Sequence, residues 1–167
     1  MLWEFTVAAQ AHPNLQNAMW VQFEPSLVRV AVNVSLKEIT VAQSLALTES
    51  SAGALSMNRA AEAHREYLLK HLKLSAGANV LSGTVVKLTP PIFGEPEQSF
   101  YQYELEYPFD GLPPAKVRFF REMLKEWPYA VGTAWDFSYV VQTKRSDASQ
   151  VSTWLLRARQ PCDILTG

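Results

Sequence analysis

The residues of this chain whose types could do chemistry begin with three histidines, His12, His64 and His71. His64 and His71 stand seven positions apart in a segment with helical periodicity, so their Cα atoms would lie about 10.5 Å apart along the axis. A shared metal ion needs both ring nitrogens within about 2.1 Å, and the usual helical pair is four positions apart. We therefore expect both side chains at the border of a buried face, each with one nitrogen in water.

His12 offers different chemistry, because Ala9-Gln10-Ala11 before it resembles the small-x-small site cut by signal peptidase. Cleavage after Ala11 would leave an α-amine and an imidazole on one residue, which together suit a Cu(II)- or Ni(II)-like ion. Pro13 has no N–H and could not add an amide ligand. The alternative is that His12 is only a turn residue ahead of a proline. A metal site at His12 therefore requires a processed N-terminus.

The remaining reactive side chains lack the partners that catalysis needs. Cys162, the single cysteine, has no histidine near it in the sequence, and a thiol without a base is usually incidental. Glu104 and Glu106 share one strand face, where we expect solvated carboxylates opposite Arg157 or Arg159. No G-x-S-x-G, glycine-rich phosphate loop or acidic metal-binding loop occurs. We expect no enzymatic activity and no cofactor, apart from a transition metal at His12.

Aromatic side chains provide a binding hypothesis. If several were exposed together they could form a platform for a carbohydrate, although most fall on the inward faces of predicted strands, where they would supply core burial. The best candidates for ligand binding are Trp127 and Tyr129, in a Trp-Pro-Tyr loop. The full set considered is Trp20, Trp127, Trp135, Trp154, Tyr101, Tyr103, Tyr129 and Tyr139.

Composition limits the classes of protein to which the chain can belong. It has 167 residues, 48% hydrophobic and 19% charged, with a formal net charge of −1. This is enough for one cohesive core and argues against a disordered chain. The missing basic excess argues against nucleic-acid binding. The sequence contains no run of 18 apolar residues, so it predicts no membrane-spanning helix. With a single cysteine, no intrachain disulfide can form. We expect a single domain over residues 1–167.

The elements that must position these residues are mostly strands. Period-two alternation predicts strands, and helical spacing of apolar residues from Met57 to Leu74 predicts one main helix. Ser35 to Glu38 matches a capping box, so a short helix begins there and runs toward Ala42. Residues 117–127 fit either a helix or the end of a strand. The expected fold is mainly β (α+β): an immunoglobulin-like β-sandwich of about seven strands with one main inserted helix near 57–74. The strand segments are 17–23, 26–35, 79–88, 100–107, 133–143 and a final one around Trp154 to Ala158.

Residues 1–11 have two interpretations. They are either the remnant of an export signal whose upstream part is missing or, from Trp3 to Ala9, a first strand. The segment before the cleavage-like site is too short for a complete signal peptide and contains Glu4.

The order of several motifs resembles one family. Ala11-His12-Pro13-Asn14 after the A-x-A step is similar to the opening of the mature part of HupE/UreJ-type bacterial membrane proteins. Further matches are the helix end at 67–72, the strand leading to Pro90-Pro91, the strand at 103–107 and the late strand at 154–156. Each match is short, and together they span most of the chain.

The resemblance implies a non-enzymatic domain outside the cytoplasm of a bacterium, in the periplasm or at the cell surface. Its partner would be the membrane-embedded part of the same protein, and its role partner recognition or metal delivery, since the family is linked to nickel or cobalt handling. The chain departs from the family in lacking a complete signal sequence and membrane helices, so no metal site is carried over. The alternative is a free-standing carbohydrate- or ligand-binding β-sandwich module.

Overall fold

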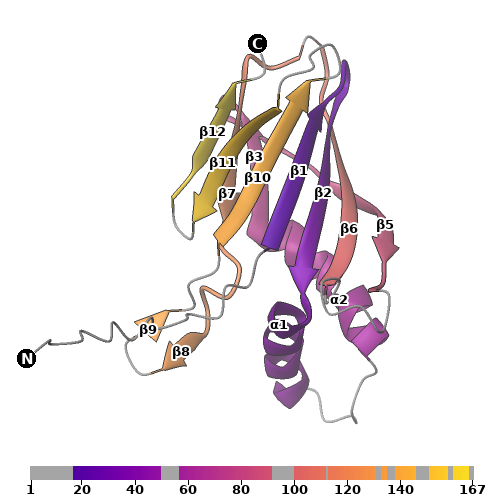
Figure 1. The fold of residues 1–167 in the computed structure, drawn as a ribbon, viewed down its shortest axis with the longest axis vertical. Coiled ribbons are helices and arrows are strands. Elements are labelled where there is room, and N and C mark those ends of the chain that lie inside the picture. Colours follow the sequence, from indigo (N-terminus) through magenta and orange to yellow (C-terminus); the bar gives the residue numbers. More distant parts are fainter. Residues whose placement is uncertain are drawn as a thin grey trace, which may run out of the picture.

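The computed structural model describes most of the chain. Within the described part, twelve strands and two helices form a mainly β fold (Figure 1). The described residues are 17–49, 57–91, 100–111, 113–130, 133–134, 138–145, 151–157 and 160–165.

The larger sheet has six strands in the order β11-β10-β1-β2-β6-β5. All its neighbours are antiparallel except β1 and β10, which run parallel, with Asn17 beside Tyr139. The strands are β1 (Asn17–Phe23), β2 (Leu27–Ser35), β5 (Thr84–Thr89), β6 (Phe100–Pro108), β10 (Ser138–Arg145) and β11 (Val151–Arg157).

The smaller sheet has four antiparallel strands in the order β12-β7-β3-β4. A separate pair of short strands, β8 and β9, lies below the larger sheet in Figure 1. These strands are β3 (Leu72–Ala76), β4 (Asn79–Leu81), β7 (Lys116–Arg121), β8 (Pro128–Ala130), β9 (Thr133–Ala134) and β12 (Cys162–Leu165).

The two helices follow β2 and precede β3. Helix α1 (Leu36–Glu49) begins at Ser35, whose Oγ accepts the Glu38 N–H at 3.2 Å, as a helix N-cap does. Helix α2 (Met57–His71) packs against the inner face of β6, where the Tyr103 hydroxyl donates to the Ala61 carbonyl at 2.9 Å. Its apolar face is what buries it there.

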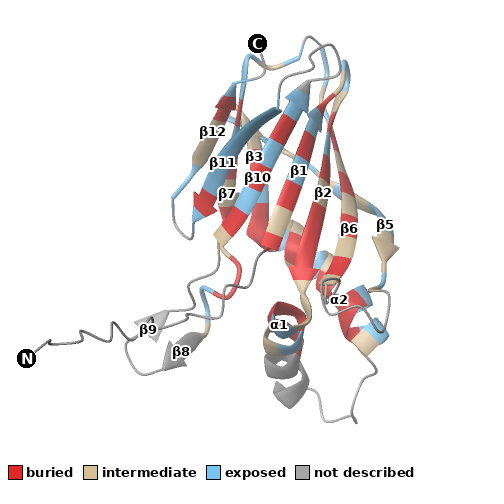
Figure 2. Ribbon diagram, viewed as in Figure 1, coloured by how far each residue is buried: buried red, intermediate tan, exposed pale blue. Residues whose placement is uncertain are grey.

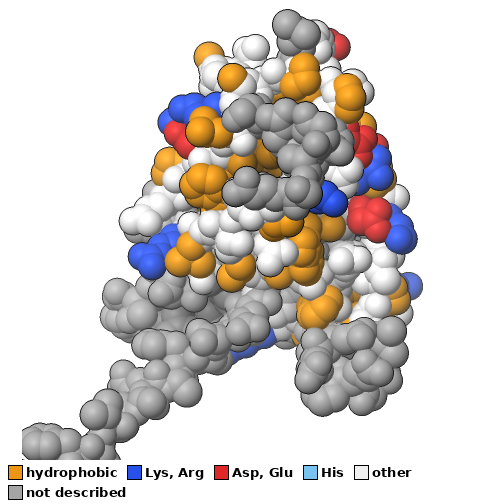
Figure 3. All heavy atoms as spheres, turned by 45° about the horizontal axis from the view of Figure 1, so that its top comes forward, with side chains coloured by type: hydrophobic (Ala, Val, Ile, Leu, Met, Phe, Trp, Pro, Cys, Tyr) orange, Lys and Arg blue, Asp and Glu red, His pale blue; other side chains and the backbone are white. Residues whose placement is uncertain are grey.

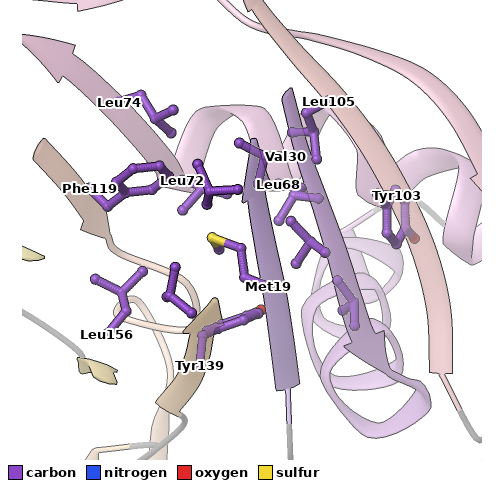
Figure 4. Close-up of a cluster of buried hydrophobic side chains, with 14 of the residues drawn as sticks. Met19, Val30, Leu68, Leu72, Leu74, Tyr103, Leu105, Phe119, Tyr139 and Leu156 are labelled. Carbon is purple, nitrogen blue, oxygen red and sulfur yellow. The ribbon is translucent and has the colours of Figure 1, made fainter. Parts of the chain in front are cut away.

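One hydrophobic core joins both sheets and α2. Along β1, β2 and β10, buried residues alternate with more exposed ones (Figure 2), so one face of the larger sheet is buried and the other, which we call the outer face, is not. Figure 4 shows Met19, Val30 and Leu105 of the larger sheet facing Leu72 and Phe119 of the smaller one. Leu68 of α2 is fully buried in the same cluster.

The expected mainly β, sandwich-like fold with a main inserted helix is confirmed. The helix ends at His71, three residues early, because the alternation Leu72-Lys73-Leu74 belongs to β3. The expected strand 79–88 is divided into β4 and β5, and the ambiguous segment 117–127 begins as β7. The helix expected to run toward Ala42 continues to Glu49. The immunoglobulin-like assignment stays a prediction, and residues 1–11 lie outside the described part.

Candidate functional site

Five polar side chains meet where α1, α2 and both sheets come together. We call them the buried polar cluster: Asn17, Glu38, His64, Arg121 and Tyr139. Each is at most 1% exposed, whereas charged residues are almost never fully buried unless paired. They come from five different elements, β1, α1, α2, β7 and β10. The cluster is therefore a product of the fold and not of any local motif.

Glu38 is the centre of the cluster. Its carboxylate accepts hydrogen bonds from Asn17 Nδ2 at 2.6 Å and from the Tyr139 hydroxyl at 3.0 and 3.1 Å. The capping box expected at Ser35 is therefore only half formed, because the Glu38 side chain turns inward. Asn17 Oδ1 takes its place and accepts the Ser35 N–H at 3.1 Å. The parallel pairing of β1 with β10 places Asn17 and Tyr139 side by side on Glu38.

Two opposing effects set the charge of Glu38. Burial raises the pKa of its carboxyl, and it outweighs the Arg121 charge and the hydrogen bonds from Tyr139 and Asn17, which lower it. The Arg121 guanidinium lies 5.4 Å from the centroid of the Tyr139 ring, within the range of a cation–π contact. Among the described residues, no acceptor bonds any of the three Arg121 guanidinium nitrogens. The positive charge of the Arg121 guanidinium is therefore compensated by Glu38 and by the ring of Tyr139.

The two helical histidines differ from each other and from the expected border position. His64 is fully buried, its Nε2 stands 4.0 Å from Glu38 Oε1, and within the described structure neither of its ring nitrogens has a hydrogen-bond partner. Burial, with a smaller contribution from His71, lowers the pKa of His64 to about 3, so the ring is neutral at pH 7. The expected wet nitrogen is wrong for His64, because α2 packs that position against the rings of Tyr67 and Tyr103.

His71 is closer to the expectation, since it lies 8% exposed at the end of α2. Its Nε2 is 3.0 Å from Glu126 Oε1 and its ring stacks on Tyr67 at 4.2 Å. Burial lowers the pKa of His71 more than Glu126 raises it. Because the pKa of His71 is lowered from 6.5, the ring beside this carboxylate is mainly neutral at pH 7.

The buried polar cluster has acid, base and cation types together, but none of its members is open to solvent. A substrate could reach it only after the core opened. Within the described part of the chain, no three His, Cys, Asp or Glu side chains come together as a metal site. Its geometry therefore fits a structural role.

The outer face of the larger sheet presents a different surface, organised in rows across strands. One row is apolar and joins Ala18, Val140 and Leu155 of β1, β10 and β11. Val140 and Leu155 are 41% and 47% exposed. In Figure 3, hydrophobic side chains gather in the middle of the face in view, and groups of charged side chains lie to the left and right of them. Contiguous exposed apolar residues are typical of an interaction surface.

The next two rows of the outer face enclose a groove of about 250 Å³, which we call the outer-face groove. Trp20 lies in it, 40% exposed, with its Nε1 donating to Gln142 Oε1 at 3.0 Å. This bond fixes the orientation of the indole. The other lining residues include Gln22, Arg29, Ala31, Lys144 and Val151.

Of the two residues expected to bind a ligand, Trp127 and Tyr129, the structure describes the side chain of Trp127 only. Trp127 is half-buried and packs against a small cluster with Leu124, because the turn at 123–127 folds it back onto α1 and α2. Tyr129 lies in β8, but its side chain is outside the described residues, and so are His12 and Trp135. The binding role of Trp127 and Tyr129 stays a prediction, as does the metal role of His12.

The other candidates behave as isolated groups. Glu104 and Glu106 point outward as expected, but they pair with Lys87 at 2.8 Å and Arg29 at 3.1 Å instead of with residues of the late strand. The reason is that β6 lies between β2 and β5. Cys162 is half-buried, and burial, helped by Asp163, raises the pKa of its thiol, which disfavours the nucleophilic thiolate.

The sequence named Trp20 among the candidate aromatic residues but did not single it out, and it did not indicate the buried polar cluster. Trp20 could have been found, because the alternation of Met19, Val21 and Phe23 places it on the opposite, outward face of the strand. The buried polar cluster had no comparable signal. Glu38 was assigned to a helix cap, and Arg121 has no neighbouring pattern that indicates burial.

No model of a known protein family matches the chain, and neither does any curated protein. Among the described residues, no helix is long and apolar enough to cross a membrane.

Proposed function

We propose that this chain is a non-enzymatic recognition domain outside the cytoplasm, belonging to a HupE/UreJ-like bacterial membrane protein. Two things support the proposal: the motifs that resemble that family, and the apolar row on the outer face, in which Val140 and Leu155 are exposed. That row, Ala18, Val140 and Leu155, is the single structural observation that carries it. The partner would be the membrane-embedded part of the same protein, and the role recognition or metal delivery.

The location is tested with the natural gene. Alkaline phosphatase, which is active only after export, is fused in frame at the codon for Leu165 with the native upstream region retained. We expect phosphatase activity in intact cells. A β-galactosidase fusion at the same codon should be inactive, and the reverse pattern would refute the proposal.

The partner is tested by photo-crosslinking in the natural gene product. A photoreactive amino acid replaces Val140 or Leu155, and the control position is Val80 of β4, which is 69% exposed on the other sheet. We expect crosslinks from the two outer-face positions to the membrane-embedded part and none from Val80. Equal crosslinking from all three positions, or none from the outer face, would refute the assigned surface.

The alternative from the sequence is a carbohydrate- or ligand-binding module with its site at Trp127 and Tyr129. Trp127 is half-buried and packs against Leu124. The side chain of Tyr129 lies outside the described residues, so a site at these two residues stays a prediction.

A further inference from the structure

The outer-face groove combines an exposed aromatic ring with polar side chains. It is lined by the exposed indole of Trp20, by the apolar side chains of Ala31 and Val151, and by two amides, Gln22 and Gln142. A small number of polar groups around an apolar floor is the usual composition of a ligand site.

One hydrogen bond orients the amide of Gln142. Its Oε1 accepts the Trp20 Nε1–H at 3.0 Å, so its amide N–H groups point away from the indole, and no described residue accepts them. Gln22 stands next to Lys144 in the parallel register and next to Arg29 in the antiparallel one. The groove therefore presents amide donors and acceptors together with one aromatic ring.

The charge of the groove comes from Lys144. Arg29 is held by Glu24 at 3.3 Å and Glu106 at 3.1 Å, so its charge is balanced within the protein. For Lys144, the described part of the chain supplies no carboxylate within ion-pair distance, and the side chain is exposed. A ligand that fills the groove would gain most if it carried a carboxylate near Lys144.

The size of the groove limits the ligand. About 250 Å³ is below the range of about 300–1,000 Å³ that holds drug-sized molecules. One six-membered ring fits this space, and because the groove is open to solvent, the ring can be one unit of a longer chain. A sugar ring has an apolar C–H face for an indole and a rim of hydroxyls for amides. An aromatic acid would leave both amides without partners.

We propose that the outer-face groove binds a carboxylated saccharide, a hexuronate unit, stacked on Trp20 with its carboxylate at Lys144. Trp20 is one of the aromatic residues named above as candidates for a carbohydrate platform. The inference is independent of the membrane-protein resemblance, because it rests only on residues of this face.

The test uses the full 167-residue chain and isothermal titration calorimetry with trigalacturonate. Its methyl ester is the uncharged probe, and polyglutamate is the charged probe without a sugar ring. We expect trigalacturonate to bind, its methyl ester to bind more weakly, and polyglutamate not to compete. No binding of trigalacturonate at millimolar concentration, or equal competition by polyglutamate, would overturn the proposal.

Variants assign the binding to the groove. Trp20→Ala should weaken trigalacturonate binding by at least about tenfold, and Trp20→Phe should retain part of it. The matched control is Trp154→Ala, because Trp154 is 36% exposed on the opposite face of β11. Equal losses from Trp154→Ala and Trp20→Ala would overturn the assignment.

Lys144→Gln should remove the preference for the acid over its methyl ester, together with the salt dependence of binding. The matched control is Lys116→Gln on the smaller sheet, with a side chain 48% exposed, which should leave the preference unchanged. A preference that survives Lys144→Gln would refute the role of that residue. Circular dichroism shows whether each variant is folded.

Discussion

At the scale of single residues, Arg121 is the most unusual feature. A guanidinium taken out of water loses several kcal/mol of solvation, which only a counter-charge and acceptors can return. Arg121 is fully buried without a described acceptor for its nitrogens, and it has Glu38 nearby as a charge and the Tyr139 ring beneath it. The energetics of this residue therefore depend on Glu38.

Replacing Glu38 by Gln should lower the free energy of unfolding by about 1–3 kcal/mol, because glutamine keeps only one acceptor oxygen for the donors of Asn17 and Tyr139. The measurement is urea denaturation at pH 7. The control is the double variant Glu38→Gln/Tyr139→Phe, which also removes the Tyr139 donor and should cost less than the sum of the two single changes. A double variant that costs the full sum would contradict this account.

The neutral, buried His64 should make the protein less stable in mild acid. Its pKa is about 3 in the folded chain, against an ordinary value of 6.5. Below pH 6.5, His64 is therefore protonated in the unfolded chain but not in the folded chain. The free energy of unfolding falls as the pH drops below 6.5. Between pH 7 and pH 5 the loss should be about 2 kcal/mol, at about 1.4 kcal/mol per pH unit.

His64→Leu removes this proton uptake, so urea denaturation at pH 7 and pH 5 should show a smaller difference than in the parent chain. Glu38 acts with the opposite sign. Burial raises its pKa above 4.5, so its contribution is complete below pH 4.5 and is lost as the pH rises through the folded pKa. The His64 account fails if the leucine variant retains the full difference between the two pH values.

At the scale of elements, the turn between β4 and β5 depends on a glycine. A Cβ at Gly83 would lie 2.8 Å from Tyr107 Cδ1, and the Tyr107 ring is buried, with its hydroxyl donating to the Leu72 carbonyl at 3.4 Å. Gly83→Ala should therefore lower the free energy of unfolding by about 1–3 kcal/mol through overpacking. Thermal denaturation measures the change.

A second substitution separates packing from backbone effects at this turn. Tyr107→Leu shortens the side chain that the new Cβ would meet, so adding Gly83→Ala in that background should cost clearly less than in the parent chain. Equal costs in the two backgrounds would show that the ring is not the reason for the glycine.

The elements also show what sequence reasoning could and could not supply. Strands with one solvated face were predictable, because period two survives wherever a strand has a wet side, as in 100–107. The end of α2 was not, since Leu72 and Leu74 continue a helical spacing as well as they begin a strand. The parallel pairing of β1 with β10 could not be predicted, because no local pattern specifies which distant strand pairs with β1.

The same reasoning explains the sites. The exposure of Trp20 could be predicted from the alternation within the seven residues of β1 alone. Glu38, Arg121 and Tyr139 become partners only when β7, β10 and α1 are placed in space. Pair contacts between residues 101 positions apart, such as Glu38 with Tyr139, leave no spacing to recognise.

At the scale of the whole molecule, the shared core predicts one cooperative unfolding transition. Leu105 of the larger sheet and Ile164 of the smaller one are both fully buried in the same cluster. Leu105→Ala and Ile164→Ala should each lower the free energy of unfolding by about 2–5 kcal/mol. Far-ultraviolet circular dichroism and tryptophan fluorescence should report the same midpoint.

Separate midpoints for the two probes would contradict the single core. So would an Ile164→Ala variant that loses only the signal of one sheet while the larger sheet unfolds at the parent midpoint. Leu165, at the end of β12 and 65% exposed, provides the control. Leu165→Ala should change stability by less than about 0.5 kcal/mol.

The parallel pairing of β1 with β10 has a consequence for biosynthesis. Trp20 and Gln142 are 122 positions apart, so a ribosome has to make most of the chain before β1 finds its neighbour. Until then β1 can pair only with β2, and its other edge stays open to other nascent strands. Folding should therefore wait for the last third of translation, and a chaperone that covers β1 would raise the yield most.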